Sequence, residues 1–282
     1  MSTTTTTAAS LIPEDVARLL IQPLEAASVV LAAGPQIFDT SRPLSVPRLT
    51  GSTSPAFVAE GALIPEVDVT FDDVTLMPTS RKSIKSISKI TEESLRASVV
   101  ALDAAVQARL VQDQAAVLDQ ALLTGDGALD TITGITNQPG IFVSAGANLA
   151  DQDTYLDAVG TWLAAEVDPS RGRWLVHPLD WIALAKVEDT TGRKIVQPDP
   201  TLAGRRTIDG IPVVITSRTP AGTVLLVDFG QVGIARDIAP TVQVLTELFA
   251  ATGHVGIKVT SRWDLGLLHP QGVVKITAPV VP

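Results

Sequence analysis

From Leu95 to Leu123 the chain contains neither Gly nor Pro, and this stretch limits most strongly what it can fold into. The preceding sequence TEES, at 91–94, places two acids where a helix begins, which is favourable because the helix N-terminus is positive. GDG at 125–127 predicts the end of this helix, since glycine commonly follows the last helical residue. At about 1.5 Å per residue, the pattern predicts a helical rod on the order of 40 Å long. Its apolar stripe, interrupted only at Gln114, comprises Leu95, Val99, Leu102, Val106, Leu110, Val117 and Ala121.

The region from Ile37 to Ile90 has a different character, because its prolines exclude a long helix. The segment from 67 to 72 alternates Val, Val and Phe with polar residues, which is typical of a half-solvated strand. Arg81 to Ile90 predicts a twisted or bulged strand, since its isoleucines are three residues apart. This region could form little core of its own. We therefore expect an extended two-stranded loop.

The rest of the chain predicts a mixture of helices and strands around a Thr-rich arm at residues 1–12. A helical pattern opens at Pro13 and closes at Gly34-Pro35. Two further helices are expected at Thr154–Glu166 and Pro178–Val187. Strands are expected at Trp174–Val176, Ile211–Thr216, Val224–Val227, Thr241–Leu248, His254–Trp263 and Gly272–Ala278.

Composition excludes several classes of function. The formal net charge is -9 and aromatic residues make up 4% of the chain, which argues against a protein that grips nucleic acid through phosphates or by base stacking. Cysteine is absent, so thiolate catalysis and disulfides are excluded. The composition is suited to a protein that assembles in a reducing compartment. No secretory signal is indicated, and no run approaches the ~18 apolar residues of a membrane helix.

Charge is unevenly distributed along the chain. Arg81, Lys82, Lys85 and Lys89 form a basic run, whereas nine acids and no Lys or Arg lie between Asp113 and Asp168. Two interpretations remain open. Both stretches could simply be solvated faces, or the basic stem of one subunit could lie against the acidic surface of its neighbour.

Familiar patterns of catalytic or ligand-binding residues are missing from the sequence. His177, His254 and His269 are not at ligand spacing, and GDG at 125–127 lacks the lysine of a phosphate loop and follows a helix. Paired aspartates at 72–73 and 151–153 lack the twelve-residue calcium pattern. We therefore expect no catalytic residue, no cofactor and no metal site.

Five segments, in order, resemble the major capsid proteins of tailed bacteriophages that have the Hong Kong ninety-seven fold. The first combines FVAEG at 57–61 with Pro65-Glu66 and TFDDVTLMPTSRKSIKSISKITEESL. The second is ALLTGDG followed by ITGITNQPGI. The third is RWLVHPLDWIALAKVEDTTGRKI. The last two are GIPVVITSR with VDFGQVGIARDIAPTVQV, and SRWDLGLLHPQGVVKI.

The resemblance implies an α+β fold of three parts. An N-terminal arm and helix would occupy residues 1–34. A peripheral domain would span 35–140 and 240–263, with an extended loop at 50–88 and a spine helix at 92–123. An axial α/β domain would span 141–239 and 264–282.

The resemblance also implies a structural role in the virion, with assembly in the bacterial cytoplasm. The chain would form hexamers and pentamers that close around double-stranded DNA without sequence-specific binding, and without a membrane. Scaffolding, portal and decoration proteins are candidate partners. The isopeptide cross-link of some relatives should be absent, because 60–65 contains no lysine and 249–253 no asparagine. The short segment before the folded body implies a separate scaffold, or none.

Interface residues are expected on the loop and its basic stem, because the loop cannot cover its apolar side chains within its own subunit. An encapsulin-type compartment is the alternative within the same fold, and a cytoplasmic α/β enzyme is the alternative from another class. The expected interface residues are Phe57, Val58, Glu60, Leu63, Val67, Val69, Phe71, Arg81, Lys82 and Lys85.

Overall fold

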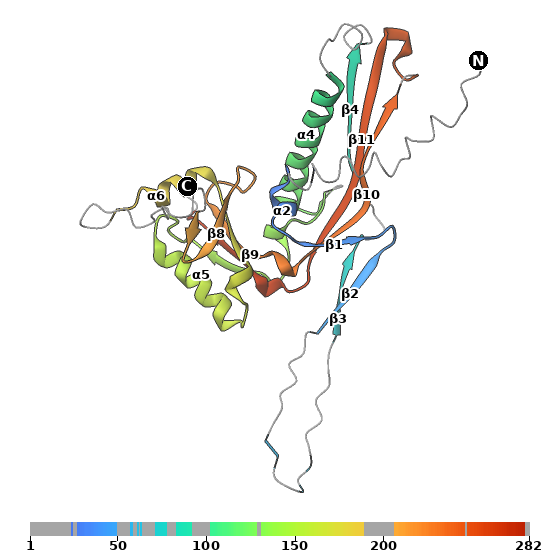
Figure 1. Cartoon of the computed structure of the whole chain (residues 1–282). Helices are drawn as coiled ribbons and strands as arrows, with labels where there is room; N and C mark the ends of the chain where they lie inside the picture. Colours follow the sequence, from blue (N-terminus) through green and yellow to red (C-terminus); the bar gives the residue numbers. More distant parts are fainter. Residues whose placement is uncertain are drawn as a thin grey trace.

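The structure is a computed structural model that describes residues 24, 27–49, 57–58, 61, 63, 71–77, 83–91, 102–128, 131–188, 206–245 and 247–279. Its strands form a four-stranded sheet, a six-stranded sheet and a two-stranded hairpin (Figure 1). A long helix lies along the four-stranded sheet, and two helices lie against the six-stranded sheet. The predicted α+β fold class is confirmed.

The four-stranded sheet has the strand order β1-β10-β11-β4. Its centre is the long antiparallel pair β10 and β11. β1 pairs with β10 in parallel orientation, and β4 pairs with β11 in antiparallel orientation. The register between β10 and β11 shifts around Ile238 and before Thr241, where Pro240 cannot donate a ladder hydrogen bond. The strands are β1 (Gln36–Asp39), β4 (Ile84–Thr91), β10 (Val232–Leu245) and β11 (His254–Leu267).

The long helix, α4 (Leu102–Thr124), packs on this sheet through Leu118, Leu122 and Leu123, which are almost fully buried. Gly125 ends it where no larger residue fits, since a Cβ there would lie 2.1 Å from the carbonyl oxygen of Ile132. The 3-10 turn η2 (Ile135–Asn137) follows. The short helix α2 (Val29–Ala32) packs on the same core through Val30 and Leu31.

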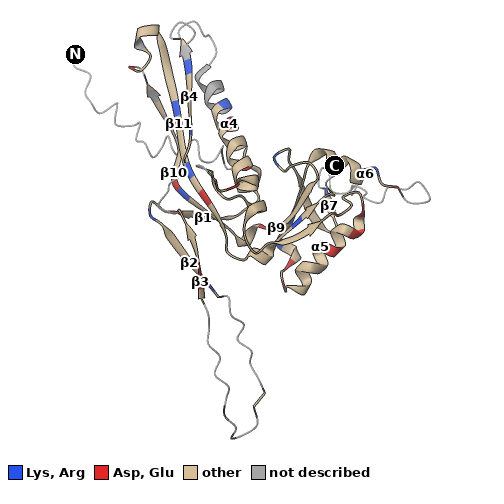
Figure 2. Ribbon diagram, turned by 180° about the vertical axis from the view of Figure 1, so that it is seen from behind, with Lys and Arg blue, Asp and Glu red and all other residues tan. Residues whose placement is uncertain are grey.

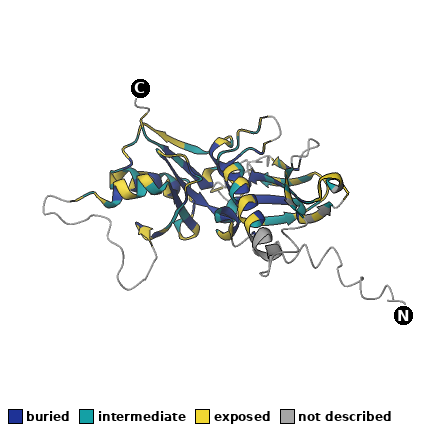
Figure 3. Cartoon of the chain, turned by 90° about the horizontal axis from the view of Figure 1, so that it is seen from above, coloured by how far each residue is buried: buried dark blue, intermediate teal, exposed yellow. Residues whose placement is uncertain are grey.

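The six-stranded sheet has the order β5-β12-β9-β6-β8-β7. One face shares the core of α4, and the other is covered by α5 (Gln152–Ala164) and α6 (Pro178–Ala185). Figure 3 shows buried residues in dark blue running through both sheets. The strands are β5 (Phe142–Ala145), β6 (Gly172–Val176), β7 (Thr207–Ile208), β8 (Ile211–Ile215), β9 (Thr223–Asp228) and β12 (Val273–Thr277), with 3-10 turns η3 (Pro169–Arg171), η4 (Phe229–Gln231), η5 (Ala250–Thr252) and η6 (Pro270–Gly272).

The two-stranded hairpin pairs β2 (Leu44–Leu49) with β3 (Phe71–Leu76) and projects away from both sheets (Figure 1). The sequence predicted an extended loop from 50 to 88, but the pairing begins at Leu44. Ile84 to Ser88 belong to β4 in the four-stranded sheet. The reason is that β4 finds a partner in β11 and so is not part of a free-standing loop.

A strand is confirmed where the sequence predicted a twisted or bulged one. β4 pairs with β11 in a continuous register from Ile84 to Thr91, so no bulge interrupts this part of it, and Ile87 is 52% exposed. One expectation needs correction. β10 begins at Val232 rather than Thr241, because β1 and β11 flank its first half. The domain boundary expected at 239/240 falls within this strand and stays a prediction.

Candidate assembly surfaces

Two large apolar side chains of the extended loop are almost completely open to solvent. Phe57 is 110% exposed and Leu63 is 94% exposed relative to an isolated residue, and Val58 is also exposed. We call these three residues the loop tip. Phe71, at the far end of the hairpin, is 69% exposed. The other expected loop residues, Glu60, Val67 and Val69, and the stem residues Arg81 and Lys82, lie outside the described residues.

The base of the hairpin, in contrast, is firmly attached to the body. Leu76 and Met77 are buried and form a small core with Ala235 of β10. The backbone N–H of Met77, which adopts a positive φ of 56°, donates to Asp264 Oδ2 at 2.7 Å. The body therefore fixes the direction in which the hairpin leaves.

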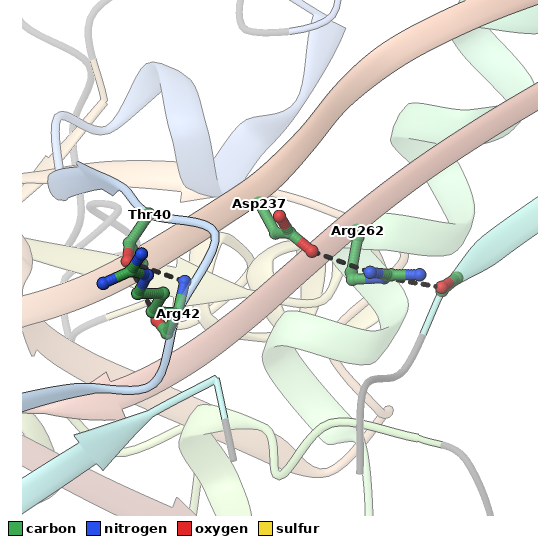
Figure 4. A network of polar contacts seen from close by, with 5 residues as sticks. Thr40, Arg42, Asp237 and Arg262 are labelled. Carbon is green, nitrogen blue, oxygen red and sulfur yellow. Dashed lines mark hydrogen bonds and ion pairs between the residues drawn. The ribbon is translucent and has the colours of Figure 1, made fainter. Parts of the chain in front are cut away.

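A half-buried ion pair joins three strands near this base. Arg262 Nη1 of β11 donates to Asp237 Oδ2 of β10 at 2.7 Å, and Arg262 Nε donates to Ser83 Oγ, beside β4, at 2.9 Å. Figure 4 shows this pair near the turn where the Thr40 hydroxyl contacts the backbone of Arg42. The contacts lie at the irregular part of the β10–β11 register, between Arg236 and Ile238.

Substituting Arg262 with Ala should lower the free energy of unfolding by about 1–2 kcal/mol, because Asp237, whose side chain is only 8% exposed, would lose its guanidinium. Urea unfolding followed by tryptophan fluorescence measures the change. Arg48→Ala is the matched control, since the Arg48–Asp72 pair is more exposed and should be worth no more than about 0.5 kcal/mol. Equal losses for both variants would contradict the role given to Arg262.

A second buried carboxylate connects the long helix to α2. Asp119 of α4, 3% exposed, accepts hydrogen bonds from the Ser28 hydroxyl at 2.5 Å and from the backbone N–H groups of Val29 and Val30 at 2.8 and 3.2 Å. Burial raises the pKa of Asp119 above its ordinary value, although these three hydrogen bonds act in the opposite direction. Asp119 therefore caps the start of α2 from a distant part of the chain.

The basic stem forms an exposed face on β4. Lys85, Ile87 and Lys89 alternate along the strand and are exposed. Figure 2 shows basic positions of β4 in blue. The ammonium group of Lys89 lies 4.2 Å from the ring centre of Phe249, whereas Lys85 has no ion pair among the described residues. Because β4 lies at the edge of its sheet, its outer backbone edge has no partner strand among the described residues.

Beside Lys85 is a cavity of about 310 Å³ between β4 and α4, which we call the spine pocket. Apart from Lys85 and Ser83, its walls are mainly apolar. Val117 of α4 is 53% exposed at its edge, although the sequence placed it in the buried stripe. The other apolar walls come from Ile84, Leu118, Ala121, Ile132 and Trp263.

The outer sides of α5 and α6 form a third surface. Leu156 and Leu163 of α5, and Leu179 and Ile182 of α6, are exposed. Acidic residues lie along α5, in red in Figure 2. These are part of the acidic stretch seen in the sequence.

Two of the polar residues that could suggest chemistry have structural roles. The His177 ring accepts from the N–H of Leu179 and caps α6, and Asp126 bonds to the turn that follows α4. No group of three potential metal ligands occurs within the described ranges. No helix in that part of the chain has the length and apolar character needed to cross a membrane.

This chain is similar to phage and GTA capsid proteins and to phage structures. A family model described as the phage capsid family matches residues 8–278. The search of curated proteins found no match. Among solved structures, the capsid of a native GTA particle, computed with C5 symmetry, has a TM-score of 0.74 at 18% identity, with 90% of each chain covered.

Two phage structures give similar results. A structure from Mycobacterium phage Bobi has a TM-score of 0.70 at 18% identity, covering 90% of this chain and 91% of the other. The mature capsid of bacteriophage PhiM1 has a TM-score of 0.63 at 11% identity, covering 90% of this chain and 88% of the other. At these identities the structures establish a shared fold.

Proposed function

The chain belongs to the phage capsid family, and from this premise we propose that it is the major capsid protein of a tailed phage, assembling as hexamers and pentamers into an icosahedral shell around double-stranded DNA. The observation that carries the proposal is the loop tip, whose large apolar side chains find no cover on their own subunit. In an isolated monomer these apolar side chains would stay exposed to water, and such exposed apolar surface is typical of an interaction site.

The arrangement of the chain suits a shell subunit. We propose that the four-stranded sheet, α4 and the hairpin form the peripheral domain, and that the six-stranded sheet with α5 and α6 forms the axial domain. The shared core of α4 and the six-stranded sheet makes the body stiff, while the projecting hairpin can adapt to rings of five or six. Virion location follows from the family, and assembly in the host cytoplasm is part of the proposal.

Double-stranded DNA would be enclosed rather than recognised, since the net charge of -9 opposes phosphate binding. Scaffolding, portal and decoration proteins are proposed partners. An encapsulin-type compartment would use the same fold around a protein cargo. Nuclease-protected DNA in purified particles supports the phage proposal, and its replacement by a cargo protein supports the alternative.

The proposal is tested by sedimentation velocity of the expressed full-length chain over a range of concentrations. We expect capsomers of five or six chains, or shells of megadalton mass, in addition to any free subunit. The Phe57→Ser, Leu63→Ser variant described below serves as the control. A single species with the mass of one chain at every concentration would contradict the proposal.

A further inference from the structure

A groove that contains two arginines lies between α2 and the six-stranded sheet. It consists of two adjoining cavities of about 350 and 230 Å³, and Ala33 and Arg173 line both of them. The larger cavity extends past the end of α2 to Arg171 and Gly230, and the smaller one follows α2 back to Ser28. We call the two cavities together the α2 groove.

The alternation of side chains along β6 places Arg173 in the floor of the α2 groove. Leu175 packs in the core of α4, whereas Trp174 and Val176 pack in the core under α5 and α6. Arg173 therefore lies on the same face of the strand as Leu175. It is half-buried, and its guanidinium forms no hydrogen bond or ion pair with any described residue. Because a partly desolvated cation is stabilised by a counter-charge, an anion from outside the subunit would be favoured at this position.

Arg171, exposed at the end of η3, supplies a second positive charge. Its Nη1 atom lies 3.3 Å from the position that a Cβ of Gly230 would occupy, so the glycine leaves room for the guanidinium. The nearby acids bind other groups. Asp168 accepts from the backbone N–H and the hydroxyl of Ser170 at 2.9 and 2.7 Å, and Asp228 accepts from the N–H of Gly230 at 2.9 Å. Neither carboxylate forms an ion pair with Arg171.

The donors in the groove match a phosphate better than a carboxylate. Each guanidinium presents a planar fork of N–H groups, which can bind an oxyanion through two parallel hydrogen bonds. Two forks exceed what the two oxygens of one carboxylate need, whereas a phosphate offers more oxygens. Gly34, Gly172 and Ala33 present little or no side chain to the larger cavity, so a compact anion can enter it.

The net charge of -9 does not oppose binding at this one place. Exposed acids elsewhere on the chain are screened beyond about 10 Å at 0.1 M salt, whereas the two arginines act at contact distance. The groove is therefore locally cationic on an acidic protein.

We propose that the α2 groove binds a phosphate oxyanion, which Arg171 and Arg173 hold together. Free phosphate and the phosphodiester backbone of DNA offer the same chemistry. The inference goes beyond the proposed function, because it requires only the folded subunit. If the phosphate belongs to DNA, the contact positions the nucleic acid and reads no sequence.

Isothermal titration calorimetry of the full-length chain with inorganic phosphate and with pyrophosphate, in chloride buffer, tests the site. We expect saturable binding at one site per chain. Arg173→Gln should weaken this binding about tenfold, because charge-assisted hydrogen bonds are lost. Arg173→Lys keeps the charge without the fork, so its affinity should lie between those of Arg173→Gln and the wild type. Circular dichroism verifies that each variant is folded.

Arg109→Gln is the matched control, because it removes the same charge from α4 at a position that is 73% exposed and lies outside the groove. This variant should bind phosphate as the wild type does. Equal weakening by Arg109→Gln and Arg173→Gln, or no saturable binding of phosphate or pyrophosphate to the wild type, would overturn the proposal.

A short DNA duplex distinguishes the two sources of phosphate, with fluorescence anisotropy as the readout. If DNA phosphates enter the groove, pyrophosphate should displace the duplex, and Arg173→Gln should reduce the slope of log affinity against log salt by about 0.9. If only free phosphate enters, pyrophosphate should bind in an Arg173-dependent manner while the duplex does not bind. An acidic peptide that binds the groove and is not displaced by pyrophosphate would assign it to a protein partner and overturn the phosphate proposal. These measurements do not depend on shell formation, so failure here leaves the proposed function intact.

Discussion

Substituting Phe57 and Leu63 together with Ser is expected to abolish shells while the subunit remains folded. Burying each of these exposed side chains should contribute about 1.5–3 kcal/mol, so their joint loss removes about 3–6 kcal/mol from each contact. Because a shell repeats this contact in every subunit, the concentration needed for assembly should rise beyond any practical range. Electron microscopy and sedimentation velocity measure the loss, and circular dichroism verifies the fold.

Conservative variants provide the matched control. Phe57→Leu and Leu63→Met keep apolar side chains at both sites and should assemble at close to wild-type concentration. Shells formed equally well by the Ser variant would show that the loop tip is not an interface.

Substituting Asp119 with Ala should lower the free energy of unfolding by about 2–4 kcal/mol. The Ser28 hydroxyl and the N–H groups of Val29 and Val30 would lose a common acceptor in a buried position. The start of α2 would then separate from α4. Urea unfolding should be measured in the non-assembling Phe57→Ser, Leu63→Ser background, so that oligomer contacts do not contribute.

Asp113→Ala is the control for this change, because it removes the same side chain from the same helix at an exposed position. Its pair with Arg109 is one helical turn away and should be worth no more than about 0.5 kcal/mol. An Asp119→Ala variant as stable as Asp113→Ala would contradict the proposed link between the two helices.

The long helix and the strands around it could be predicted because their signals are local. The Gly- and Pro-free stretch, the stop at Gly125 and the short buried strands all depend on neighbouring residues. The sequence could not show which side of the helix is buried. Gln114, which interrupted the apolar stripe, is 4% exposed and accepts a hydrogen bond from Ser261 of β11, whereas Val117 faces outward.

Long-range pairing limited the prediction of the sheets. The first half of β10 lies between β1 and β11, which are distant in sequence, so its beginning at Val232 could not be recognised locally. The same holds for Asp119, because the residues that it caps lie some ninety positions earlier in the chain. Nothing in the spacing of either segment indicates that they meet.

The candidate surfaces were predictable in part. The sequence identified a loop without a core of its own, and Phe57, Val58, Leu63 and Phe71 are exposed in the structure. It also identified the basic run that includes Lys85. The spine pocket depends on the packing of β4 against α4, and only the folded chain reveals it.

A cryo-electron microscopy reconstruction of the particles formed by the full-length chain tests the central claim most directly. We expect a closed shell in which the segment around Phe57 and Leu63 lies against an adjacent copy. Particles in which that segment folds back onto its own subunit, or a preparation that contains only free monomers, would contradict it.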